Sequence, residues 1–64
     1  MKDIESFSTR ENVIKYRDLC RQGLIGPELA KAMGVEDSFL RLWLTAKLAF
    51  IRETLAKEKN RRFK

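Results

Sequence analysis

The residues that most readily interrupt regular secondary structure all lie in one short stretch of this 64-residue chain. The three glycines and the single proline, Gly23, Gly26, Pro27 and Gly34, fall within twelve consecutive positions. The segments on either side are rich in Leu, Ala, Lys, Arg and Glu, which favour helix. The sequence therefore predicts one all-α domain, in the order helix, turn, short helix, turn, long helix.

The first predicted helix spans residues 9–23. Ser8 and Glu11 have the spacing of a capping box, in which each side chain bonds the backbone amide of the other residue. At the other end, Gly23 suits a left-handed cap. This helix is therefore expected to begin just after Ser8 and to end at Gly23.

One side of the first helix carries apolar residues at helical spacing and is expected to face the core: Val13, Tyr16 and Cys20. Cys20 is accordingly interpreted as a packed thiol rather than a nucleophile. The preceding residues 1–7 are expected to form a short arm. Ile4 or Phe7 would attach this arm to the body of the domain.

The second predicted helix is short, residues 27–33, with Pro27 at the first helical position, where a missing amide hydrogen costs nothing. The third begins at Glu36 or Asp37 and is expected to run to residue 60, because no breaker follows. The alternative is a turn at residues 45–47, with Thr45 as the cap of a separate fourth helix.

Small and apolar residues around Gly34 have the spacing of two helices that pack steeply across a short turn. Ala30 allows the close approach, and further apolar residues supply the buried side: Leu29, Val35, Leu40 and Trp43. The segment Gly26–Thr45 resembles the bacterial and phage helix-turn-helix, as in small phage or plasmid regulators. With residues 13–24 it resembles the homeodomain-like type of resolvases, invertases and transposases. A generic three-helix bundle would use the same apolar residues.

This resemblance implies a three-helix helix-turn-helix domain that binds double-stranded DNA, with its third helix in the major groove. The residues that would then contact bases are Ser38, Arg41, Thr45 and Asp37. Arg41 is the strongest of these, because its guanidinium group matches guanine O6 and N7. Asp37 would accept a hydrogen bond from cytosine or cap the helix. Phosphate contacts would come from Pro27 at the start of the second helix, Lys31, Arg10 and Arg52.

If the third helix is continuous, it is apolar almost all round and must be buried on more than one side. One stripe would pack within the domain: Leu40, Leu44, Leu48, Ile51 and Leu55. The second apolar sector is expected to form a homodimer interface: Phe39, Leu42, Ala46, Ala49, Phe50 and Leu55. Two-fold symmetry would present two recognition helices to successive DNA half-sites.

Two features weaken the DNA-binding interpretation and favour an alternative. Glu36 and Asp37 place negative charge at the end of the helix that would approach phosphates, and Phe39 and Leu42 are apolar for a surface that faces DNA. The alternative function is a helical protein-protein interaction module, such as an adaptor or anti-factor, that binds its partner through Phe39 and Leu42.

The composition narrows the function classes further. The chain has no histidine and one cysteine, so it offers no set of metal ligands and no disulfide within one copy. We expect no enzymatic activity, no cofactor and no small-molecule substrate, because acid-base chemistry would fall to carboxylates on exposed helices. The net charge of +5 favours a polyanionic partner. No signal peptide or membrane span is expected, which predicts a cytoplasmic protein.

Overall fold

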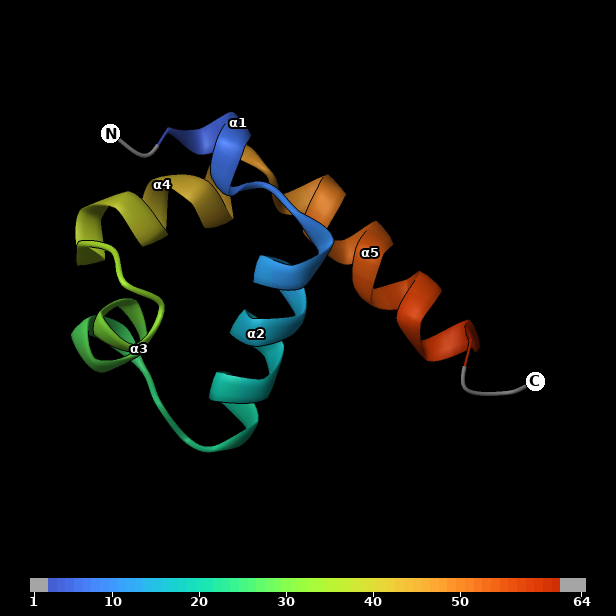
Figure 1. Cartoon of the computed structure of the whole chain (residues 1–64), viewed down its shortest axis with the longest axis horizontal. Coiled ribbons are helices and arrows are strands. Elements are labelled where there is room, and N and C mark those ends of the chain that lie inside the picture. Colours follow the sequence, from blue (N-terminus) through green and yellow to red (C-terminus); the bar gives the residue numbers. More distant parts are fainter. Residues whose placement is uncertain (1–2, 62–64) are drawn as a thin grey trace.

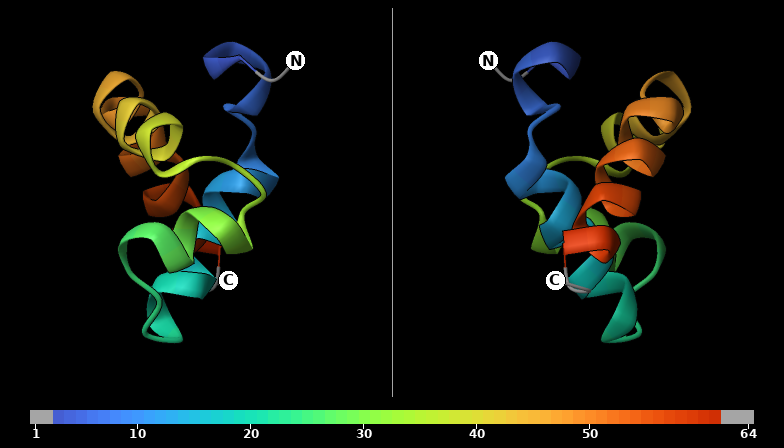
Figure 2. Two further views of the ribbon diagram at one scale, coloured as in Figure 1. Left: turned by 90° about the vertical axis from the view of Figure 1, so that its left-hand side faces the viewer. Right: turned by 90° about the vertical axis from the view of Figure 1, so that its right-hand side faces the viewer.

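A computed structural model of the chain describes residues 3–61, and within that range the chain is helical and contains no strand (Figure 1). The all-α prediction is therefore confirmed. The helices are α1 (Ile4–Phe7), α2 (Arg10–Arg21), α3 (Gly26–Ala32), α4 (Asp37–Ala46) and α5 (Leu48–Arg61). α3 packs against α2 and α4, and α5 packs against the same two helices. In the side views, α1 and α2 lie on one side of the molecule, and α4 lies with the start of α5 on the other (Figure 2).

The core lies between these two sides. Its buried members come from every helix: Phe7, Val13, Leu29, Ala30, Met33, Leu40, Trp43 and Ile51. Trp43 is fully buried and meets two other rings edge to face, Phe7 at 4.9 Å and Tyr16 at 6.0 Å between ring centres. The inward positions expected around Gly34 are thus confirmed as core, except that Val35 is only half-buried.

Two of the glycines end helices in the way the sequence predicts. Gly23 follows α2 with φ +96°, and Gly34 follows α3 with φ +77°. After each, the next amide reaches back five residues, from Leu24 to Leu19 O at 3.2 Å and from Val35 to Ala30 O at 3.0 Å. These are Schellman caps, which need a left-handed residue that glycine supplies without strain.

The start of the chain differs from the prediction. The expected arm, residues 1–7, contains the short helix α1, capped by the carboxylate of Asp3, which accepts from the Ser6 amide at 2.7 Å. Phe7 is buried, as expected for the residue that attaches this segment.

The predicted capping box is wrong, because Thr9 caps α2 and its hydroxyl accepts from the Asn12 amide. Ser8 is engaged elsewhere. Its hydroxyl accepts from Trp43 Nε1 at 3.0 Å and donates to Ile4 O at 2.6 Å. It therefore links the buried indole to α1 and is not available to cap the next helix.

The prediction of one continuous helix over residues 36–60 is wrong, because the chain breaks between α4 and α5 at Lys47. The alternative of a turn at residues 45–47 is confirmed, except that Thr45 lies within α4. Lys47 has φ −116° and ψ 27°, and its amide still donates to Trp43 O at 2.9 Å. In a straight helix, Ile51 would lie about 16 Å beyond Leu40 along the axis, outside so small a core. The break turns α5 back toward α2, and Ile51 is buried in the same core.

Two expected core positions are instead exposed. Cys20 is exposed, because it lies in the last turn of α2, at the end of that helix remote from α4 (Figure 1). Leu48, the first residue of α5, is 50% exposed, because the break removes it from the apolar stripe of α4. No helix in the described range is both long and apolar enough to cross a membrane.

Candidate nucleic-acid interface

The outward side of α4 holds three of the four residues predicted to contact bases. Ser38, Arg41 and Thr45 are all exposed, because the burial of Leu40 and Trp43 fixes the orientation of the helix. Their spacing of three and four residues places them in one row along the helix. The structure therefore brings together the two hydroxyls and the guanidinium group that the sequence analysis selected.

The fourth residue, Asp37, forms an ion pair with Arg41. Asp37 Oδ2 lies 3.2 Å from Arg41 Nε, and the two residues are one helical turn apart on α4. Asp37 does not cap the helix as one interpretation expected, because Glu36 occupies the N-cap position and makes no side-chain cap bond. The Arg41 side chain is 77% exposed, so this pair is worth at most about 1 kcal/mol and is easily exchanged.

The residues predicted to contact phosphates are spread over three helices. Pro27 and Lys31 are exposed on α3, at its first and last turns, and Arg52 is exposed on α5. Arg52 therefore lies on a different helix from Arg41, although a continuous helix would have aligned them. Arg10 forms an ion pair with Glu58 across the contact between α2 and α5. The structure does not gather these four residues into one cluster.

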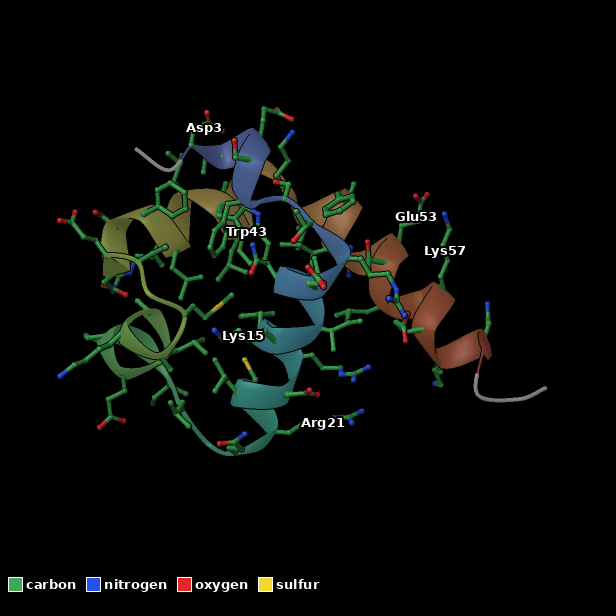
Figure 3. The ribbon with its side chains drawn as sticks, in the orientation of Figure 1. Asp3, Lys15, Arg21, Trp43, Glu53 and Lys57 are labelled. Atoms are coloured by element: carbon green, nitrogen blue, oxygen red, sulfur yellow. The ribbon has the colours of Figure 1, made fainter. Side chains whose placement is uncertain are left out.

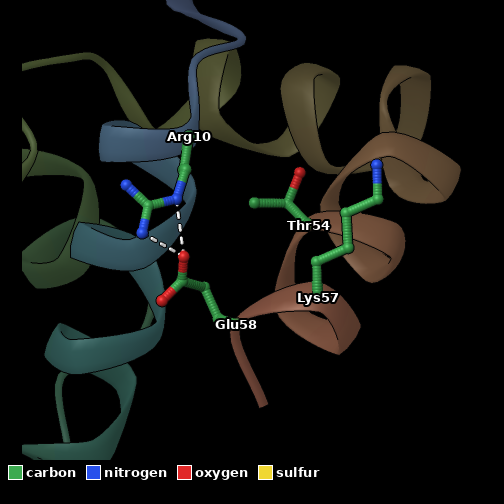
Figure 4. Close-up of a pocket in the computed structure, with 4 residues that line it drawn as sticks. All are labelled: Arg10, Thr54, Lys57 and Glu58. Carbon is green, nitrogen blue, oxygen red and sulfur yellow. Dashed lines mark hydrogen bonds and ion pairs between the residues drawn. The ribbon is translucent and has the colours of Figure 1, made fainter. Parts of the chain in front are cut away.

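A pocket of about 320 Å³ lies between α2 and α5 and is lined by Arg10, Thr54, Lys57 and Glu58 (Figure 4). The guanidinium group of Arg10 is bonded to the Glu58 carboxylate inside it. Lys57 extends away from that pair (Figure 4). The opposite charges of Arg10 and Glu58 thus balance each other at this contact between α2 and α5.

The predicted dimer residues divide into two sets. Phe39 packs edge to face on Phe7, with ring centres 5.3 Å apart, and Phe50 and Leu55 are half-buried against the core. The others remain exposed: Leu42, Ala46 and Ala49. Leu48 joins this exposed set and was missed by the sequence analysis, because only the break at Lys47 reveals it. The homodimer stays a prediction.

Two side chains outside α4 have perturbed pKa values. Burial raises the pKa of Tyr16, with smaller contributions from a hydrogen bond to Cys20 and from the electrostatic interaction with that side chain. The hydrogen bond from the Ser6 amide lowers the pKa of Asp3. In the described range, no group of three or more Cys, Asp or Glu side chains is placed to hold a metal ion.

Comparison with known proteins adds no further assignment. The chain matches no model of a protein family, no curated protein and no solved structure.

Proposed function

We propose that this chain is a small DNA-binding protein, a transcriptional or mobile-element regulator that inserts α4 into the major groove of duplex DNA. The observation that carries the proposal is the arrangement of α4, which is buried through Leu40 and Trp43 and presents Ser38, Arg41 and Thr45 on its opposite side. α3 and the Gly34 turn support α4 from one side. The major groove is wide enough to admit a helix, and the net charge of +5 favours association.

Arg41 is the central residue of the proposed reading. In the free protein its guanidinium group is paired with Asp37, and on DNA it would exchange that carboxylate for guanine O6 and N7. Breaking the pair with Asp37 costs little free energy, because exposed ion pairs contribute little to stability. Ser38 and Thr45, on the same side of α4, would donate hydrogen bonds to bases or phosphates.

The proposal is tested by selecting bound sequences from a random pool of duplex DNA and measuring affinity for the selected site. Arg41→Ala is expected to weaken binding about 5- to 150-fold, corresponding to a bidentate contact of roughly 1–3 kcal/mol. The matched control is Lys15→Ala, which removes an exposed cation from α2. Absence of any DNA binding at low salt, or an equal effect of both variants, would overturn the proposal.

The exposed apolar residues support a second candidate, a protein-protein interaction module. Leu42 is 57% exposed and Leu48 is 50% exposed, and Ala46 lies between them in the sequence. A second copy of the chain is the simplest partner, as in the predicted homodimer. Sedimentation at tens of micromolar protein would give the mass of a dimer, and Leu42→Asp would reduce it to a monomer. A monomer in both cases contradicts this candidate.

A further inference from the structure

Positive charge is distributed unevenly along the chain. Residues 22–47, which contain α3 and α4, carry three basic and three acidic side chains and have no net charge. Residues 48–64 carry six basic side chains against two acidic ones, a surplus of four. The whole net charge of +5 therefore lies outside the segment that contains α3 and α4.

Internal ion pairs increase this asymmetry. Of the three cations in residues 22–47, Arg41 is paired with Asp37, and the Lys47 ammonium is 2.6 Å from the Glu5 carboxylate. Lys31 is left as the cation of that segment with no ion pair in the described part of the chain. The α3–α4 unit thus has little charge available for a phosphate backbone.

Three of the six cations in residues 48–64 have side chains in the described part of the chain, Arg52, Lys57 and Lys59, and they lie on α5, which is fixed to the rest of the molecule. Ile51 is 3% exposed, Leu55 is half-buried, and Glu58 is paired with Arg10 of α2. Arg52 and Lys59 are exposed and make no ion pair with any described residue. They are seven residues apart, which places them on one side of the helix and about 10 Å apart along its axis.

Another side of α5 carries one basic and one acidic residue, Lys57 and Glu53, and so has no net charge. Glu53 and Lys57 lie close together on α5 (Figure 3), with Lys57 Nζ 3.7 Å from Glu53 Oε1, and both side chains are at least 70% exposed. This pair is largely screened by solvent and balances its own charge. The uncompensated cations in the described part of α5 are therefore those on the side that carries Arg52 and Lys59.

We infer that Arg52 and Lys59 on α5 form the main contact with the phosphate backbone of duplex DNA, while α4 supplies contacts to the bases. This inference rests on the proposed function, since it assigns the charge-dependent part of the same binding event. Each phosphate that a cation neutralises releases condensed counterions, so the dependence of affinity on salt reports the number of such contacts. Two cations about 10 Å apart on one side of a helix reach different phosphates.

The test compares two double variants with the same loss of charge. Arg52→Gln with Lys59→Gln removes the α5 contact, and Lys15→Gln with Arg21→Gln removes two exposed cations from α2. The dissociation constant for random-sequence duplex DNA is measured for the full chain at a series of salt concentrations. Circular dichroism checks that both variants keep the helical content of the parent.

The α5 variant is expected to make the plot of log affinity against log salt shallower by about 1.8, or about 0.9 per contact. The control variant is expected to change this slope by no more than half as much. An equal or larger change in the control variant would overturn the inference and leave DNA binding itself intact. If the parent chain binds no duplex DNA at low salt, the proposed function fails, and this inference fails with it.

Discussion

The two turns that flank α4 are built in different ways. The turn before it, at Gly34, has φ +77° and the two backward hydrogen bonds of a Schellman cap. The break after it, at Lys47, has φ −116°, contains neither glycine nor proline, and lies within a run of good helix formers. The first turn is specified by local sequence, and the second by what α4 and α5 must pack against.

This difference explains why the Lys47 break depends on the core. The amide of Lys47 bonds to Trp43 O, and its side chain is paired with Glu5 of α1. Trp43 is fully buried, and Ile51, one turn past the break, is 3% exposed. The break therefore gains its stability from the burial of residues on both sides, since no glycine or proline near Lys47 interrupts the helix.

The largest expected effect comes from removing the anchor of the break. Trp43→Ala should lower the free energy of unfolding by about 3–5 kcal/mol, because it leaves a large cavity between Phe7 and Tyr16. Denaturant titration followed by circular dichroism measures this loss. A chain of this size has little stability to spare, so Trp43→Phe serves as the milder variant, which keeps a ring but loses the bond to Ser8. A loss below about 1 kcal/mol for Trp43→Ala would show that the tryptophan does not hold the break.

Alanine substitution at each turn gives a direct comparison. Gly34→Ala should cost about 1–2 kcal/mol, because φ +77° is strained for a residue with a Cβ. Lys47→Ala should cost less than about 1 kcal/mol, because its φ is accessible to any residue and only a partly exposed ion pair is lost. Thermal unfolding of the two variants side by side measures the difference. Equal costs would mean that the two turns do not differ in the way proposed.

The sequence predicted the parts of the fold that local chemistry determines. The breakers at Gly23 and Gly34, the inward residues Leu29 and Leu40, and the burial of Trp43 all followed from spacing and turn preference. The break at Lys47 was open in the sequence, as one of two alternatives, because the choice between them depends on tertiary packing. The role of Ser8 did not follow from the sequence, because it depends on a tertiary partner. No periodicity indicates that a serine expected to cap α2 will instead accept from an indole 35 residues later.

The candidate interface shows the same limit. The row of Ser38, Arg41 and Thr45 was predictable, because it requires only the buried side of one helix. The partners of the cations were not, since the bond from Arg10 to Glu58 requires α5 to fold back toward α2. The spacing of residues in the sequence thus identified side chains that could contact DNA. The tertiary structure decides which of the charged ones are already paired with another residue of the chain.

The smallest expected effect tests whether the packing around Trp43 extends to α2. Tyr16 packs on that ring, and burial, together with Cys20, raises its pKa above the ordinary value of 10.0. A raised pKa means that the folded state holds the proton more tightly, so the stability that the protonated Tyr16 contributes is fully present below pH 10 and is lost as the pH rises through the raised pKa. Tyr16 is the only tyrosine, so absorbance titration follows it alone. Cys20→Ser should lower this pKa only part of the way, because burial is the larger cause; a complete return to the ordinary value would show that the ring is not packed against the core.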